Sequence, residues 1–118
     1  MPTVEKIIPV LFVRDMKRSV EWYTRVLGFR VRFEEDEGEY VGLECDGAQI
    51  HLAQRGAPEG VRLKGALQLR LRVGIDEYVA AIVATGESLV APLGNSGDMR
   101  GATVRAPDDN DVYIGQLL

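Results

Sequence analysis

His51 and Gln49, two positions apart in a predicted strand, are the residues of this sequence best suited to chemistry. His51 is the only histidine of the chain, and imidazole can hold a metal, contact a ligand or move a proton. In the predicted strand Ala48–Ala53, Ile50 and Leu52 share one face while Gln49, His51 and Ala53 share the other, because strand residues alternate between faces. A lone strand histidine is also commonly a structural residue that pairs with a neighbour or with water. Since no acid, base or nucleophile pairs with it in the sequence, we predict ligand contacts for Gln49 and His51 and no catalytic residue.

A second polar set lies on two strands of the other half of the chain. Leucines alternate with Gln68 and Arg70 along the predicted strand Ala66–Val73, and Tyr113 lies in the final predicted strand. If Gln68 belongs to a ligand site, the Arg70 guanidinium beside it favours a carboxylate, a phosphate or a planar aromatic ligand. Tyr113 can stack on a flat ligand or form a hydrogen bond to it. The alternative interpretation is a half-exposed sheet face that is simply wet.

Composition limits the classes of protein to which these residues can belong. The chain has 118 residues, 46% hydrophobic and 27% charged, as expected for one packed domain. Its formal net charge of −4 argues against nucleic acid as a partner. The single cysteine, Cys45, cannot form an internal disulfide and indicates a reducing compartment. With no secretion signal and no apolar run of membrane-spanning length, we predict a cytoplasmic protein that binds no membrane.

Local signals in the first half predict a strand, a helix and three further strands. The run Ile7–Val13 is rich in β-branched residues and predicts a strand, which Pro9 limits to an edge or interrupts near its start. Asp15 is a predicted helix N-cap, and Gly28 marks the end of the helix. The three strands that follow are Phe29–Glu35, Tyr40–Cys45 and Ala48–Ala53, and a loop is predicted at Gln54–Gly65.

The second half repeats this order. Val13 and Val73 lie 60 positions apart, and the helix-ending glycines Gly28 and Gly86 lie 58 apart. These offsets favour a tandem βαβββ repeat, although two unrelated stretches of similar size remain an alternative. The predicted elements are the strand Ala66–Val73, the helix Asp76–Thr85, a short strand near Ser88–Ala91, a loop at Pro92–Asp98, and the strands Arg100–Arg105 and Asp111–Leu117.

Several motifs within this repeat form a recognisable pattern. They are the segment Ile8–Asp15, the helix residues Ser19–Tyr23, the turn Leu27–Phe29 and the hairpin Pro107–Asn110, where Ala106 and Asp109 depart from the usual residues. Together they resemble the vicinal oxygen chelate superfamily of glyoxalases, extradiol dioxygenases and bleomycin-resistance proteins, and most closely its bleomycin-resistance-like branch. The resemblance implies an α+β fold in which tandem βαβββ modules form a curved mixed sheet of half-barrels, with helices on the convex face and a ligand site on the concave face. It also implies a single domain at 1–118, with module one at 7–53, a linker at 54–65 and module two at 66–118.

Metal-dependent relatives hold their ion with four side chains, two from each module. The resemblance places those positions at Ile8, His51, Gln68 and Tyr113. Isoleucine has no donor atom, a neutral phenol and a neutral amide are weak ligands, and only the imidazole is a good one. We therefore expect no metal and no cofactor.

The resemblance and the weak donor set together favour a metal-free small-molecule binding protein of the antibiotic-resistance type. Such a protein sequesters its ligand in a crevice of a homodimer, lined by both chains. One alternative is a metal-dependent lyase or dioxygenase of the same superfamily with a degenerate metal site. Another is a non-catalytic module whose concave face is filled by its own side chains. The predicted ligand-binding residues are Phe12, Gln49, His51, Gln68, Arg70 and Tyr113.

Overall fold

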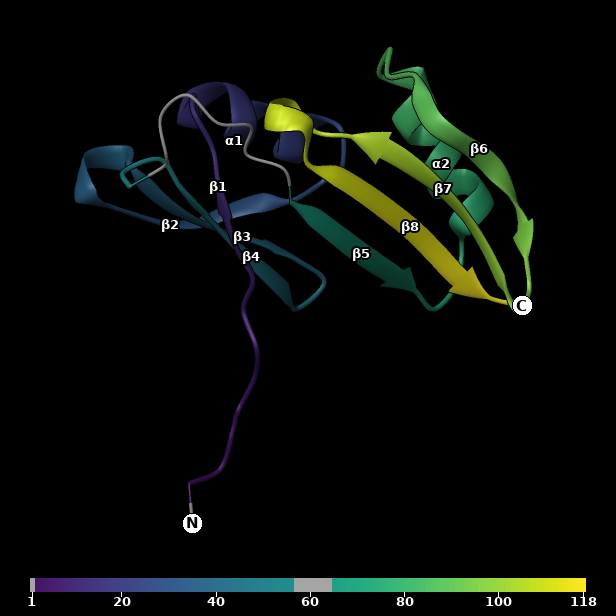
Figure 1. Cartoon of the computed structure of the whole chain (residues 1–118), viewed down its shortest axis with the longest axis horizontal. Helices are drawn as coiled ribbons and strands as arrows, with labels where there is room; N and C mark the ends of the chain where they lie inside the picture. The colour runs from purple at the N-terminus through teal and green to yellow at the C-terminus, as the bar shows by residue number, and fades with distance from the viewer. Residues whose placement is uncertain (1, 57–64) are drawn as a thin grey trace.

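The computed structural model describes residues 2–56 and 65–118, which form two βαβββ modules side by side (Figure 1). Four strands form sheet A in the order β1-β4-β3-β2, and four form sheet B in the order β5-β8-β7-β6. In each sheet the parallel pair joins the first and last strands of the module in chain order, β1 with β4 and β5 with β8. The other neighbouring strands pair antiparallel. The expected α+β fold with tandem βαβββ modules is therefore confirmed.

The first module places its helix on one face of sheet A. Asp15 caps α1 (Met16–Arg25), because its carboxylate accepts a hydrogen bond from the Arg18 backbone amide. The helix buries Met16, Ser19, Trp22 and Tyr23 toward the core. The strands of this module are β1 (Val10–Phe12), β2 (Arg30–Glu35), β3 (Tyr40–Cys45) and β4 (Ala48–Ala53), with a short 3-10 turn at Asp36–Gly38.

The second module repeats the arrangement. Its helix α2 (Ile75–Ala84) buries Ile75, Val79 and Ile82. The facing side of sheet B contributes the fully buried Val104, Val112 and Ile114. The strands are β5 (Ala66–Leu71), β6 (Leu89–Ser96), β7 (Met99–Arg105) and β8 (Asp111–Leu117), with a 3-10 turn at Pro107–Asp109. No helix of the described residues is both long enough and apolar enough to cross a membrane.

The first strand is shorter than the sequence predicts. We predicted it at Ile7–Val13, but β1 begins only at Val10. Pro9 accepts a hydrogen bond from the His51 amide at 2.9 Å but has no amide hydrogen to donate. The chain before it leaves the body as an extended arm, on which Ile7 is 88% exposed (Figure 1).

The sixth strand is longer than the sequence predicts. The expected loop at Pro92–Asp98 is mostly strand, because β6 runs from Leu89 to Ser96. Pro92 is tolerated there because β6 is an edge strand whose register shifts between Ala91 and Gly94, so no regular ladder bond is lost at the proline. The other predicted strands, and the helix of the second module, agree with the structure within two residues at each end. The predicted linker 54–65 falls largely on residues 57–64, outside the described part of the chain.

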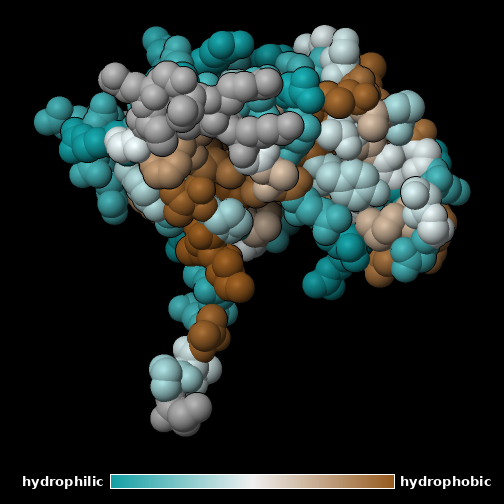
Figure 2. Space-filling model, in the orientation of Figure 1, coloured by the Kyte–Doolittle hydropathy of each residue, from teal (hydrophilic) through white to brown (hydrophobic). Residues whose placement is uncertain are grey.

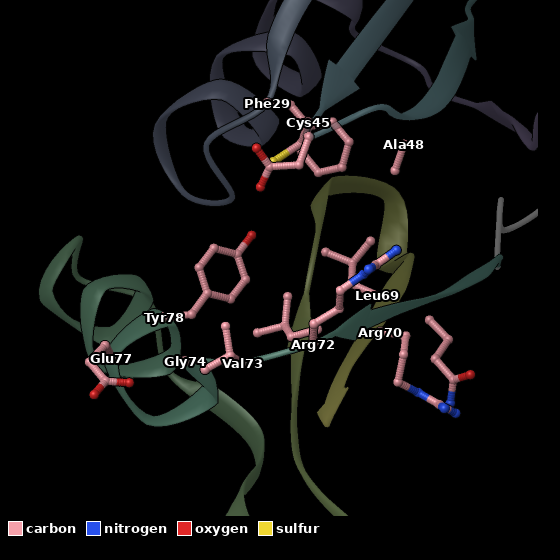
Figure 3. A pocket seen from close by; sticks show the side chains of 13 residues that line it. Phe29, Cys45, Ala48, Leu69, Arg70, Arg72, Val73, Gly74, Glu77 and Tyr78 are labelled. Atoms are coloured by element: carbon pink, nitrogen blue, oxygen red, sulfur yellow. The ribbon is translucent and has the colours of Figure 1, made fainter. Parts of the chain in front are cut away.

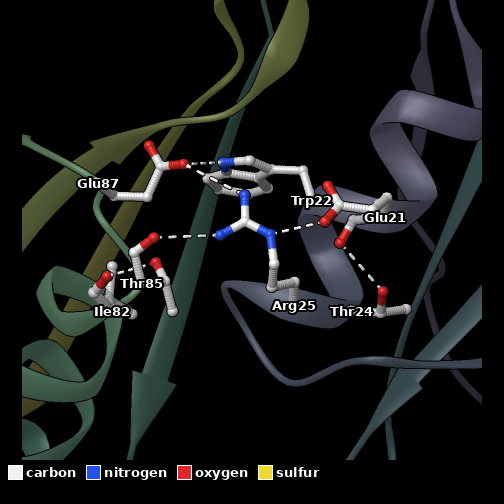
Figure 4. Close-up of polar contacts among 7 residues, drawn as sticks. All are labelled: Glu21, Trp22, Thr24, Arg25, Ile82, Thr85 and Glu87. Carbon is white, nitrogen blue, oxygen red and sulfur yellow. Dashed lines mark hydrogen bonds and ion pairs between the residues drawn. The ribbon is translucent and has the colours of Figure 1, made fainter.

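Contacts between the two modules fix their relative position. The Trp22 indole donates to Glu87 Oε1 at 3.0 Å, and Arg25 Nη1 donates to the Thr85 carbonyl at 3.2 Å (Figure 4). The Tyr78 hydroxyl donates to the Leu27 carbonyl at 2.5 Å. Buried apolar residues of both modules belong to one continuous core cluster, so the face of each sheet that no helix covers is presented on a common body.

Candidate functional site

The face of sheet A opposite α1 carries a cluster of aromatic rings. Phe33 stacks with Tyr40 at a centroid distance of 6.3 Å and an interplanar angle of 23°. The His51 ring stands edge-on to both, 5.1 Å from Phe33 and 5.2 Å from Tyr40. We call Phe33, Tyr40, Gly42 and His51 the aromatic floor.

A glycine and a bulge give the floor its shape. A Cβ atom at Gly42 would lie 2.7 Å from Cδ1 of Phe33, so only glycine lets the ring lie this close to the sheet. The β2–β3 register shifts between Val31, which pairs with Leu43, and Phe33, which pairs with Gly42. This extra residue turns Phe33 onto the face opposite the core. Regular alternation from Val31 would have placed Phe33 on the core side.

The imidazole of the floor is held by a neighbouring strand. The Tyr40 hydroxyl and His51 Nδ1 lie 2.7 Å apart, and both side chains are partly buried. His51 Nε2 has no hydrogen-bond partner among the described residues. The floor therefore combines partly exposed aromatic side chains with one imidazole nitrogen that no described residue bonds.

The corresponding face of sheet B combines a tyrosine with polar and cationic side chains. Tyr113 lies over Gly101 and Gly115, where a Cβ atom at Gly115 would come within 2.7 Å of the ring. Gln68 is the direct register partner of Tyr113 across the parallel β5–β8 pair, and Arg70 follows on the same face of β5. We call Gln68, Arg70, Gly101, Tyr113 and Gly115 the polar floor.

Two arginines, one in β5 and one in the turn after it, carry charges that no described side chain pairs. Arg70 and Arg72 have no ion pair or hydrogen bond to a described side chain. Arg100 by contrast is paired with Asp76 at 2.7 Å, and Arg105 with Asp111 at 2.8 Å. Unpaired guanidinium groups on this edge favour an anionic or planar partner.

A cavity of about 670 Å³ lies at the junction of the modules (Figure 3). Its lining includes Phe29 and Cys45 of module one and Tyr78 of α2, with Arg70 of β5 and Arg72 of the turn that follows. Burial raises the pKa of the Cys45 thiol above its ordinary value, with a smaller contribution from the neighbouring Asp46 carboxylate. A thiol with a raised pKa is a weak nucleophile, so this cavity offers volume and charge rather than covalent chemistry.

The structure divides the predicted ligand-binding residues between the two sheets. Those on sheet A are Phe12, Gln49 and His51, and those on sheet B are Gln68, Arg70 and Tyr113. A smaller cavity of about 260 Å³ is lined by Gln49 of the first set and Gln68 of the second. The sequence prediction missed Phe33 and Tyr40, since their positions depend on the pairing of β2 with β3 and of β3 with β4.

The residues at the metal positions do not fit a metal ion. Val10, rather than Ile8, is the register partner of His51, as Gln68 is of Tyr113. The structurally equivalent four are therefore Val10, His51, Gln68 and Tyr113, with one good donor among them. Within the described ranges no three His, Cys, Asp or Glu side chains are grouped as a metal site would require.

The chain belongs to the Glyoxalase/Bleomycin resistance protein/Dioxygenase superfamily, whose sequence pattern matches residues 6–114. This membership agrees with the resemblance inferred from the motifs. No curated protein sequence matches the chain significantly.

Solved structures share its fold at low sequence identity. TnmS3, an antibiotic binding protein from Streptomyces sp. CB03234, has a TM-score of 0.85 at 17% identity, over 100% of this chain and 99% of its own. TioX from Micromonospora sp. ML1 has a TM-score of 0.85 at 21% identity, over 98% and 100%. Lactoylglutathione lyase from Agrobacterium tumefaciens has a TM-score of 0.79 at 16% identity, over 98% and 96%. The same fold thus serves proteins described as binding an antibiotic and as lyases.

Proposed function

We propose that this protein is a metal-free small-molecule binding protein that sequesters a flat aromatic ligand. The observation that carries the proposal is the aromatic floor, in which Phe33 lies against Gly42 and leaves ring surface on a face that no helix covers. Aromatic rings bind flat ligands by stacking and by excluding water from apolar area. The antibiotic-binding relative with the same fold supports this class of function, and we propose a role in antibiotic resistance in the cytoplasm.

We also propose that residues 1–118 form one domain and that two copies form a homodimer whose crevice is lined by both chains. The strands β1 and β5 are both edge strands, with backbone groups free to pair outside their own sheet. Exposed apolar side chains continue from the arm onto β1, where Val10 and Phe12 are 46% and 42% exposed (Figure 2). Contiguous exposed apolar surface of this kind is typical of an interface. A second chain seated there would bring a polar floor to face an aromatic floor.

Calorimetric titration with flat polycyclic aromatic compounds tests the binding proposal. We expect saturable binding that Phe33→Leu weakens about fivefold, since it removes one stacking ring. The matched control is Phe29→Leu, the same substitution at a buried position that lines the junction cavity instead. Absence of binding would refute the proposal, as would a reaction that depends on added metal. Binding lost in Phe29→Leu but retained in Phe33→Leu would move the site to the junction cavity.

Sedimentation equilibrium tests the dimer. We expect the mass of two chains for the wild type and a shift toward one chain in Val10→Lys, because a charge on the edge strand opposes pairing. Val83→Lys on α2 is the matched control, since Val83 is also 46% exposed but lies on the helix side. A wild type that sediments as one chain would refute the shared crevice.

A further inference from the structure

The hydrogen bond between Tyr40 and His51 determines which polar atom the aromatic floor offers to a ligand. Tyr40 Oη lies 2.7 Å from Nδ1, and neither side chain has another polar partner among the described residues. The two residues come from adjacent antiparallel strands and share the face opposite the core.

The chemistry of the two groups sets the direction of this bond. A phenol is a strong hydrogen-bond donor, and the unprotonated nitrogen of a neutral imidazole is a better acceptor than a phenol oxygen. The Tyr40 hydroxyl therefore donates and Nδ1 accepts. An Nδ1 that accepts carries no hydrogen, so in the neutral ring the hydrogen is on Nε2.

We propose that Tyr40 is a positioning residue that holds His51 as an Nε2–H donor, and that the ligand is a flat aromatic compound with an acceptor oxygen, such as an aryl ketone or a quinone. This inference rests on the proposed function and specifies its ligand. A ring that covers the floor removes water from Nε2–H, and a buried donor left without an acceptor carries a free-energy penalty. A ligand oxygen that accepts from Nε2–H avoids that penalty, while the rings of Phe33 and Tyr40 receive the flat part of the ligand.

Nitrogen NMR of the single histidine tests the positioning role without any ligand. We expect imidazole nitrogen shifts of the neutral Nε2–H tautomer in the wild type. In Tyr40→Phe we expect a mixture of both tautomers, because the ring is retained while the donor is lost. Tyr78→Phe is the control, since its hydroxyl bonds to the Leu27 carbonyl and not to His51. A wild-type spectrum with hydrogen on Nδ1, or a Tyr40→Phe spectrum identical to the wild type, would overturn the role of Tyr40.

Fluorenone and fluorene form a matched pair of probes for the ligand class, because they differ only at the central ring carbon, which is a carbonyl in fluorenone and a CH2 group in fluorene. We expect the wild type to prefer fluorenone about tenfold, the ratio that corresponds to one unpaired buried donor. Tyr40→Phe and His51→Leu should lose most of this preference, which is measured as the ratio of the two affinities so that a change common to both probes cancels. His51→Gln retains an N–H donor on the same strand position and should keep part of the preference.

The outcomes separate the inference from the proposed function. Equal wild-type affinity for both probes overturns the acceptor-oxygen inference and leaves aromatic binding intact. Loss of affinity for both probes in Tyr40→Phe, with an unchanged ratio, also overturns it. If neither probe binds the wild type, the proposed function itself fails, and the ligand class fails with it.

Discussion

The uncovered faces of the two sheets each place an aromatic ring against glycine, but they surround that ring with different side chains. In sheet A the ring of Phe33 lies on Gly42, and in sheet B the ring of Tyr113 lies on Gly101 and Gly115. Around these rings sheet A adds aromatic side chains, whereas sheet B adds an amide and an unpaired guanidinium. Gly42 pairs with His51, whereas the equivalent partner of Tyr113 in sheet B is Thr103, so the glycines beneath the two rings do not occupy equivalent positions of the repeat. The side chains around the rings also differ, being aromatic in sheet A and polar or cationic in sheet B.

The glycines of the two floors differ in what they contact. The three atoms nearest to a Cβ at Gly42 would all belong to the Phe33 side chain, which can rotate away. A Cβ at Gly101 would also lie 2.7 Å from the Ile114 carbonyl oxygen, which belongs to the sheet and cannot move. Sheet B is therefore the less tolerant of the two, and the predictions below begin there.

Gly101→Ala should be the most damaging of these substitutions, with a loss of about 2–3 kcal/mol in the free energy of unfolding from overpacking against backbone. Urea denaturation measures it. Gly94→Ala on the neighbouring strand is the control, because a Cβ there has nothing within 4 Å, and it should stay within about 0.5 kcal/mol of the wild type. Equal losses of unfolding free energy in the two variants would show that the contacts around Gly101 do not exclude a larger side chain there.

Gly42→Ala should cost less stability, about 1 kcal/mol, because the displaced group is a side chain. Its larger effect should be on binding, since the substitution lifts Phe33 from the sheet and makes the aromatic floor shallower. Calorimetry with fluorene measures the affinity, and urea denaturation measures the stability. A variant that loses stability but binds fluorene as the wild type does would contradict the role of Phe33 in the site.

Arg70→Gln tests whether the positive charge of the polar floor contributes to ligand affinity. If the guanidinium faces the ligand, a fluorenone carboxylate should bind the wild type about threefold more tightly than fluorenone does, and this advantage should disappear in the variant and at high salt. Arg105→Gln is the control, because Arg105 already pairs with Asp111 on the same sheet. If Arg70→Gln still binds the carboxylate probe more tightly than fluorenone, a residue other than Arg70 recognises the carboxylate.

Glu44→Gln, at the rim of the aromatic floor, should have the smallest effect, and one that depends on pH. The hydrogen bond from Arg30, at 2.6 Å, holds the pKa of the Glu44 carboxyl below its ordinary value in the folded protein. Glu44 therefore stabilises the fold at pH above its unfolded pKa, and this contribution is lost as the pH falls through the lower folded pKa. The wild type should be slightly more stable than the variant at neutral pH and no more stable in acid, as measured by denaturant titration across pH. Glu34→Gln, which changes a residue with no ion pair to a described side chain, should show no such convergence.

Local signals in the sequence were sufficient for most of the fold. The Asp15 cap, the tight turns and the repeat offsets each depend on a few neighbouring residues, and the structure confirms the elements they predict. The limits of β1 and β6 were wrong because they depend on pairing: β1 pairs with β4 only from Val10 onward, and the shifted register of β6 accommodates Pro92.

The candidate site was harder to predict, because it depends on contacts between strands. Alternation placed His51 correctly on the face opposite the core, but its hydrogen-bond partner Tyr40 lies on another strand. Phe33 reaches the same face only through the bulge in β2, and periodicity cannot reveal a bulge. Pairing register likewise decides that Val10, rather than Ile8, stands opposite His51.

The hydrogen bond between Trp22 and Glu87 makes tryptophan fluorescence a probe of the contact between the two modules. Trp22 is the only tryptophan of the chain, and its indole is buried at the junction of the modules, on the helix side of sheet A (Figure 4). Indole emission depends on the polarity around the ring, so the fluorescence of the whole chain reports whether the two modules are docked. A red shift that precedes the loss of secondary structure in denaturant would mark separation of the modules before either one unfolds.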